Sequence, residues 1–141
     1  FIRNEDQKAI LDYNKAIELL TEQMKGKIGY YETMQKTGVW QEPFVVELKL
    51  RNAKLFCDRG IAYTVSGDFT RAIADFDNAI EIDPEYALGY KNRAVALFLA
   101  GEYGKSGKDA AQAERLGAVL APDFKKALEE RILRGTQTRR K

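Results

Sequence analysis

Few side chains in this sequence could carry out chemistry. It has no histidine and one cysteine, Cys57, which excludes histidine-based acid–base catalysis, an internal disulfide and a cysteine cluster for zinc or iron–sulfur. Activation of Cys57 would need a neighbouring base or cation, so we interpret it as a packed or groove-lining thiol. Gly104-Lys105-Ser106 resembles the end of a phosphate-binding loop, but Leu99 stands where that pattern requires its first glycine.

Carboxylates are numerous, and Asp75, Asp77 and Glu81 lie close together in the sequence. Glycosidase-type catalysis needs two carboxylates that face each other in a cleft. On an amphipathic helix these three residues are more simply explained as a solvated face. The sequence therefore predicts a protein that is not an enzyme, with no catalytic residues, no cofactor and no metal site.

The composition is that of one soluble globular domain over residues 1–141. The formal net charge is +2, with 45% hydrophobic and 31% charged residues, which argues against disorder. No apolar run approaches the ~18–20 residues of a membrane helix. The chain begins with Phe1 rather than Met, which indicates a processed product or a fragment. A single cysteine slightly favours the cytoplasm and is also compatible with a secreted chain.

Basic residues gather at the end of the chain, where residues 125–141 hold seven basic and two acidic side chains. Nucleic-acid-binding segments typically interleave such charges with aromatic residues, and aromatic residues are lacking here. We interpret residues 135–141 as a solvated basic tail and expect no nucleic-acid partner.

A 34-residue period organises most of the sequence. Aromatic residues recur at Phe56, Tyr90 and Phe124, and Gly67-Asp68-Phe69 returns as Gly101-Glu102-Tyr103. Within the first copy, the pattern Phe56-x-x-Arg59-Gly60-x-x-Tyr63, followed by Ala72-x-x-x-Phe76 and Pro84, resembles the tetratricopeptide repeat. Gly60 is expected to let the neighbouring helix approach closely, because it has no side chain.

The resemblance implies an all-α fold, with antiparallel helix pairs stacked as a short right-handed superhelix. We assign one repeat to residues 53–86, a second to 87–120 and a terminal capping helix to 121–134. Residues 8–18 match residues 71–81 almost one for one, so we interpret residues 5–20 as the second helix of a partial repeat.

Residues 21–52 form an insertion between this helix and the first full repeat. Apolar residues continue at alternating steps of three and four from Ile10 to Met34, which is typical of one long helix. Pro43 suits the first turn of a second helix, so we predict an extended antiparallel hairpin with Trp40 at its tip. Gly26 and Gly29 leave a helix break open as an alternative. Trp40 is either an exposed anchor for a partner or a cap on the hairpin's own core.

The resemblance also implies a protein–protein interaction module or scaffold. Its concave groove would be lined by the first helix of each repeat and would hold a peptide or helix of another protein. A chaperone-tail clamp is not expected, because only Asn92 matches that pattern. The alternative is an accessory domain of a larger protein. The predicted groove residues are Lys54, Cys57, Ile61, Thr64, Leu88, Lys91, Asn92, Val95 and Phe98. For Ile61, Val95 and Phe98, packing inside the helix pairs remains the competing interpretation.

Overall fold

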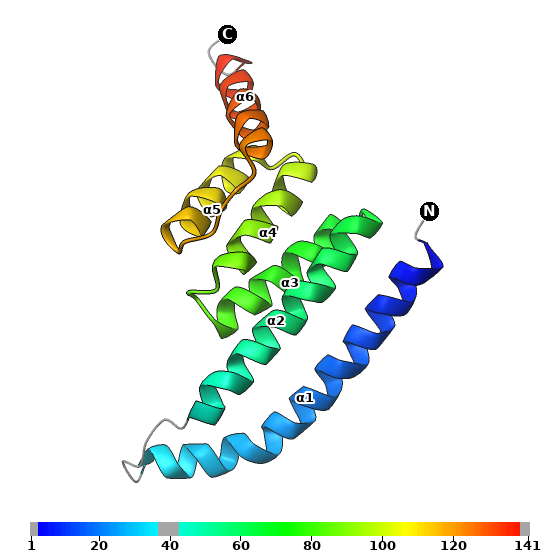
Figure 1. The fold of residues 1–141 in the computed structure, drawn as a ribbon, viewed down its shortest axis with the longest axis vertical. Helices are drawn as coiled ribbons and strands as arrows, with labels where there is room; N and C mark the ends of the chain where they lie inside the picture. Colours follow the sequence, from blue (N-terminus) through cyan, green and yellow to red (C-terminus); the bar gives the residue numbers. More distant parts are fainter. Residues whose placement is uncertain (1–2, 37–42, 139–141) are drawn as a thin grey trace.

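The computed structural model describes the backbone of residues 3–36 and 43–138, and the side chains of residues 3–23 and 50–136. Six α-helices and no strand are present in these ranges (Figure 1). The prediction of an all-α repeat solenoid is confirmed. The helices are α1 (Asn4–Lys36), α2 (Pro43–Ser66), α3 (Phe69–Ile82), α4 (Ala87–Leu99), α5 (Tyr103–Arg115) and α6 (Pro122–Thr138).

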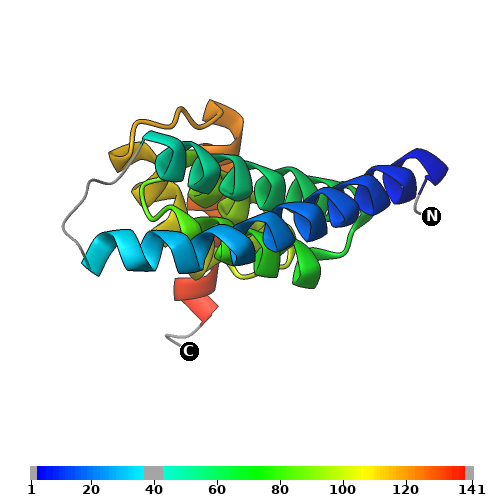
Figure 2. The same cartoon turned by 90° about the horizontal axis from the view of Figure 1, so that it is seen from below.

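The first two helices are much longer than the four that follow. Helix α1 continues without a break through Gly26 and Gly29, and α2 begins at Pro43, before the expected start of the first repeat. The two helices contact each other and run side by side in opposite directions (Figures 1 and 2). Trp40 lies outside the described residues, so its predicted place at the tip stays a prediction.

Each of the next two helix pairs turns at a glycine. Gly67 and Gly101 have φ angles of 83° and 84°, a left-handed conformation that glycine adopts at no steric cost. After each glycine, a backbone N–H bonds back to the preceding helix, from Asp68 to Tyr63 O and from Glu102 to Leu97 O. The same turn is therefore built twice, at equivalent positions of the two repeats.

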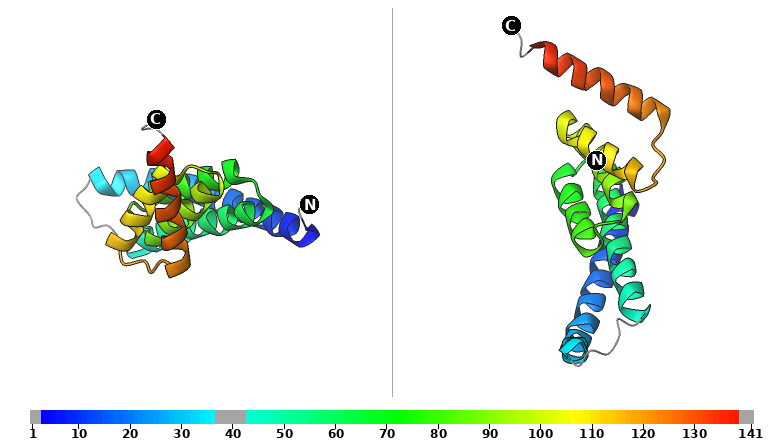
Figure 3. Two further views of the ribbon diagram at one scale, coloured as in Figure 1. Left: turned by 90° about the horizontal axis from the view of Figure 1, so that it is seen from above. Right: turned by 90° about the vertical axis from the view of Figure 1, so that its left-hand side faces the viewer.

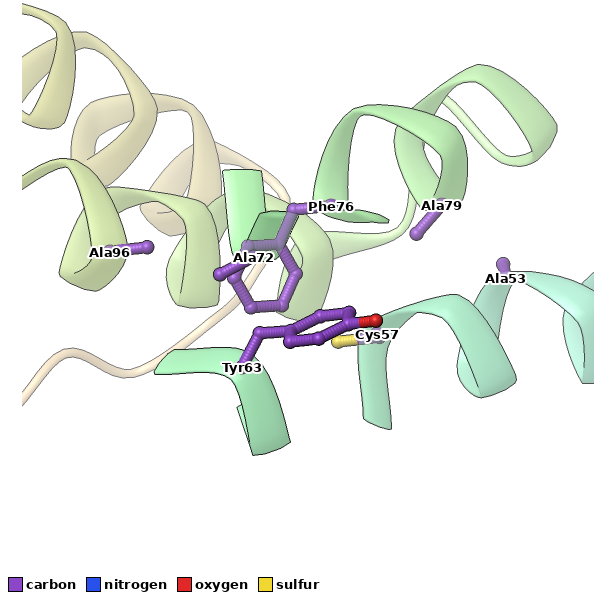
Figure 4. Packing of buried hydrophobic residues seen from close by; sticks show 7 residues of the cluster. All are labelled: Ala53, Cys57, Tyr63, Ala72, Phe76, Ala79 and Ala96. Atoms are coloured by element: carbon purple, nitrogen blue, oxygen red, sulfur yellow. The ribbon is translucent and has the colours of Figure 1, made fainter. Parts of the chain in front are cut away.

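The core of the first repeat depends on one close approach between helices. Phe76 of α3 is fully buried, and its ring lies against Gly60 of α2 (Figure 4 shows the Phe76 ring above that of Tyr63). A Cβ atom at position 60 would be 2.7 Å from Phe76 Cε1. In the second repeat, Ala94 stands at the position of Gly60 and Ala110 at the position of Phe76. The residue on the first helix is thus slightly larger than in the first repeat, and the residue on the second helix is much smaller.

Helix α6 covers the end of the stack, where it lies across the α4–α5 pair (Figure 3). Leu128 is buried in a cluster with Ala94, Ala110 and Leu120, and Phe124 packs against that cluster. The helix runs to Thr138, so the predicted boundary at residue 134 was too early and residues 135–138 belong to the helix rather than to a tail. Within the described residues, no helix is long and apolar enough to cross a membrane.

We predict that Gly60→Ala lowers the free energy of unfolding by about 1–3 kcal/mol, because the added methyl overpacks against the buried Phe76 ring. Urea denaturation measures the change. Gly104→Ala is the matched control, since a Cβ at position 104 of α5 meets nothing within 4 Å. The control should leave stability unchanged or slightly raised; equal losses in both variants would contradict the close packing at Gly60.

Candidate functional site

Two neighbouring helices, α2 and α4, carry a matching row of surface residues. The row on α2 is Lys54, Asp58, Ile61 and Val65, and the row at the equivalent positions of α4 is Leu88, Asn92, Val95 and Leu99. Steps of four, three and four place each row along one side of its helix, and α2 contacts α4. We call these eight residues the α2–α4 surface.

Several apolar side chains on this surface are open to solvent. Ile61 is 41% exposed, Val65 62%, Leu88 47% and Leu99 51%, while Val95 is half-buried. Ile61 thus lies on α2, and Leu88 and Val95 lie on α4, which contacts α2. Their place in a partner-binding groove stays a prediction. Val65 was not among the predicted groove residues, although its one-turn spacing from Ile61 was a signal for it.

The polar residues of the α2–α4 surface are Lys54 and Asp58 on α2 and Asn92 on α4. Lys54 Nζ donates to Asp58 Oδ2 at 2.6 Å, and this hydrogen bond is the main reason why the pKa of Lys54 is raised. Thr64 lies outside the rows and is half-buried, with its Oγ1 donating to Gly60 O at 2.9 Å. Lys91 is half-buried on α4.

Cys57 joins the two helices instead of lining the groove. Its side chain is 2% exposed, and Asn92 Nδ2 donates to Cys57 Sγ at 3.2 Å. Burial raises the pKa of the Cys57 thiol. Burial also raises the pKa of Tyr86 to about 12, with further contributions from Cys57 and Asp58. Of the two interpretations of Cys57, its burial agrees with a packed thiol and not with a groove-lining one, because its position on α2 faces α4.

Phe98 was wrongly predicted as an accessible groove residue. Its ring makes edge contacts with Tyr103 of α5 and Phe124 of α6, with centroid distances of 5.3 and 5.6 Å. It packs against the cluster that includes Leu128. Helix α6 therefore packs against Phe98 through Phe124. This agrees with the alternative interpretation, in which Phe98 packs among the helices of the stack.

A pair of arginines sets the position of α2 and α4 in the stack. Arg59 of α2 binds Asp75 of α3 through two parallel hydrogen bonds, Nε to Oδ2 at 2.7 Å and Nη2 to Oδ1 at 2.6 Å. Its remaining nitrogen, Nη1, donates to Asn14 Oδ1 of α1 at 2.6 Å. One guanidinium thus holds α2 to the helices before and after it, and Asp75 raises its pKa chiefly through hydrogen bonding.

The same arrangement recurs in the second repeat. Arg93 of α4 binds Asp109 of α5 at 2.6 and 2.8 Å and donates to Asp77 of α3 at 2.6 Å. Hydrogen bonding to Asp109 is the main reason why the pKa of Arg93 is raised. We call the two arginines and their four partners, Asn14, Asp75, Asp77 and Asp109, the arginine ladder.

The ladder corrects the interpretation of the carboxylates as a solvated face. Asp75 is only 3% exposed, because it lies between α3 and α2 with both oxygens bonded to Arg59. Asp77 and Glu81 are exposed, as expected. The signal was available in the sequence, since Arg59 and Asp75 both recur one repeat period later, as Arg93 and Asp109.

Comparison with known proteins agrees with this geometry. The family model for the tetratricopeptide repeat matches residues 53–86. The first full repeat therefore matches the tetratricopeptide repeat. The crystal structure of the Sgt2 TPR domain from Aspergillus fumigatus aligns with 99% of the chain and 84% of that domain, with a TM-score of 0.56 and 19% identity. At this level of identity the likeness establishes the fold alone.

A curated relative covers a smaller part of the chain. The Protein SGT1 homolog of Oryza sativa subsp. japonica is 34% identical over 58 residues, which is 41% of this chain. The match spans 16% of the rice protein's length.

We predict that the Cys57 thiol reacts slowly with a thiol reagent at pH 8 in the folded protein and fast in denaturant, because it is buried with a raised pKa. The ordinary value for the unfolded thiol is 9.0, so the stability that this site contributes is present below pH 9 and is lost as the pH rises above it. Reaction at equal rates in both states would show that the thiol is accessible.

Proposed function

We propose that this protein is an interaction module that holds a peptide or helix of a partner protein on the α2–α4 surface. The observation that carries the proposal is the set of exposed apolar side chains on two adjacent helices, Ile61, Val65, Leu88 and Leu99. Single exposed apolar residues are common on protein surfaces, but grouped ones often mark interaction sites.

The distribution of residues on this surface indicates the chemistry of the partner. Ile61 and Val65 on α2 correspond to Val95 and Leu99 on α4, so the end of the surface where both helices finish is apolar. Toward the other end, Lys54 and Asp58 are paired with each other on α2, and the exposed Leu88 lies at the equivalent level of α4. A suitable partner segment therefore has apolar side chains along one face, as an amphipathic helix does.

The arginine ladder supports the proposal in a second way. Binding is favoured when the receiving surface is already in place, because less conformational freedom is lost on association. Arg59 and Arg93 each bond the helices on both sides of α2 and α4, so the surface is held in position before any partner arrives.

A second candidate function is that of an accessory domain within a longer protein. It is favoured by the rice relative, in which the matched stretch is only 16% of the whole length. The two functions are compatible, since the same surface would then bind a segment from elsewhere in that protein.

We expect Ile61→Asp and Leu88→Asp to abolish capture of partners that the parent chain retains in a pull-down, because each places a carboxylate on the apolar contact area. Val119→Asp is the matched control: Val119 is 81% exposed and lies between α5 and α6, away from the α2–α4 surface. Circular dichroism should show that all three variants remain folded. If both surface variants keep every partner of the parent, the α2–α4 surface is not the binding site.

A further inference from the structure

The arginine ladder stops before α6. At the junction between α3 and α4, Arg93 reaches back from α4 and donates to Asp77 of α3 at 2.6 Å. One repeat period later, the equivalent positions hold Ala127 on α6 and Ala111 on α5, which have no polar side-chain atoms. The missing arginine belongs to α6 itself, so a segment on the far side of α6 cannot restore this contact. Helix α6 is therefore joined to α5 without the contact that fixes α4 to α3.

An exposed ion pair is found at the α5–α6 junction. Lys125 Nζ lies 2.7 Å from Glu114 Oε1, and the two side chains are 45% and 43% exposed. Solvent screens such pairs, so they contribute little to stability. The ladder pair of Arg93 and Asp109, with side chains 21% and 11% exposed, is screened much less. The exposed pair therefore holds α6 less firmly than the ladder holds α2 and α4.

The apolar contact of α6 is also small. Leu128 is the one buried residue among the described side chains of α6, residues 122–136, whereas α3, α4 and α5 each bury four residues. Burial of apolar surface is the main term that favours docking of a helix. A further helix on the far side of α6 would not enlarge the contact between α6 and the α4–α5 pair. We therefore expect α6 to separate from that pair more readily than the two repeats come apart.

The face beneath α6 is apolar and partly aromatic. Phe98 makes edge contacts with Phe124 of α6 and with Tyr103 of α5. Leu128 of α6 packs into a cluster of small and branched residues. The members of this cluster on the covered face are Ala94, Ala110 and Leu120. Separation of α6 therefore uncovers one side of Phe98 together with this cluster.

We propose that α6 is a displaceable cover: it opens from the α4–α5 pair as one unit while the two ladder-held repeats stay folded, and opening uncovers a second apolar face centred on Phe98. The hinge is the linker of residues 116–121, which lies between the two helices and contains Gly117 with a φ angle of 91°. The released helix loses its structure, because helices in proteins owe most of their stability to tertiary packing.

Opening of α6 regulates the size of the binding site. Phe98 directly precedes Leu99 and lies three residues after Val95, and both of these belong to the α2–α4 surface. In the closed state Phe98 is engaged by Phe124. In the open state Phe98 extends the apolar part of the α2–α4 surface. This regulatory role rests on the proposed function, whereas the opening itself does not depend on it.

Native-state hydrogen exchange of the full chain measures the opening. The amides of residues 126–132 should share one protection factor, at least about tenfold below that of α4. Urea should change the exchange of α6 little, because opening exposes a small area, and should change that of α4 strongly. Protection equal to that of α4 with the same urea dependence would overturn the proposal. A steady fall in protection toward the end of α6 would also overturn it, because that pattern indicates fraying.

A restored ladder contact should hold the cover closed. Ala111→Asp with Ala127→Arg recreates the Asp77–Arg93 pair one period later, and we expect the protection of residues 126–132 to rise about tenfold, because a charge-assisted hydrogen bond then links α5 to α6. Ala127→Arg alone is the matched control. It adds the same side chain without its partner and should raise protection by less than about twofold. Equal protection in the single and double variants would contradict the proposal.

A labelled peptide of residues 121–136 probes the uncovered face, with binding followed by fluorescence anisotropy. In the chain variant Leu128→Ala the attached α6 competes less well, so this variant should bind the peptide about tenfold more tightly than the parent chain does. A peptide that itself carries Leu128→Ala should bind more weakly. Ile61→Asp in the chain should leave peptide binding unchanged whether or not the proposed function holds. Equal affinity of the parent chain and its Leu128→Ala variant for the peptide would overturn the proposal.

Discussion

The repeat geometry depends on a bidentate contact between an arginine on the first helix of each pair and an aspartate on the second. Arg59 with Asp75 and Arg93 with Asp109 are both largely buried, and each arginine also reaches back to the preceding helix, at Asn14 or Asp77. A buried guanidinium is costly unless its nitrogens are bonded. Because all these hydrogen bonds must form at once, α2 and α4 have little freedom to shift or rotate in the stack. The residues of the α2–α4 surface are therefore held at fixed positions relative to one another.

Most of the fold could be predicted from spacing alone. The repeat period indicated both helix pairs, Gly60 marked the close approach that Phe76 fills, and the steps of three and four from Ile10 onward indicated that α1 continues past the usual length of a repeat helix. The helix pairs could be predicted because their residue pattern repeats. The close approach could be predicted because glycine has no side chain and lets a neighbouring helix come near. The end of α6 was less predictable: the terminal helix was expected to end at residue 134, but it continues to Thr138.

The candidate surface was harder to predict because helical spacing cannot tell which neighbour covers a given side. Cys57 and Phe98 have the same spacing as exposed groove residues, but α4 covers one of them and α6 with α5 covers the other. Asp75 looked like a solvated carboxylate for the same reason: only the position of Arg59 on the facing helix shows that it is paired. The residues on which the proposed binding depends, Ile61, Val65, Leu88 and Leu99, are those whose side chains stay exposed in the stack.

The most direct measurement of this account is a double-mutant cycle on the Arg59–Asp75 pair, with free energies of unfolding from urea denaturation. If the ladder fixes the stack, Asp75→Asn alone costs roughly 3 kcal/mol or more, because it leaves a buried guanidinium unpaired, and Arg59→Gln with Asp75→Asn together costs less than the sum of the two single changes. Glu114→Gln, which breaks the exposed Lys125–Glu114 pair between α5 and α6, should cost less than ~1 kcal/mol. A cost for Asp75→Asn as small as that of Glu114→Gln, with strictly additive effects in the cycle, would contradict the central role of the arginine ladder.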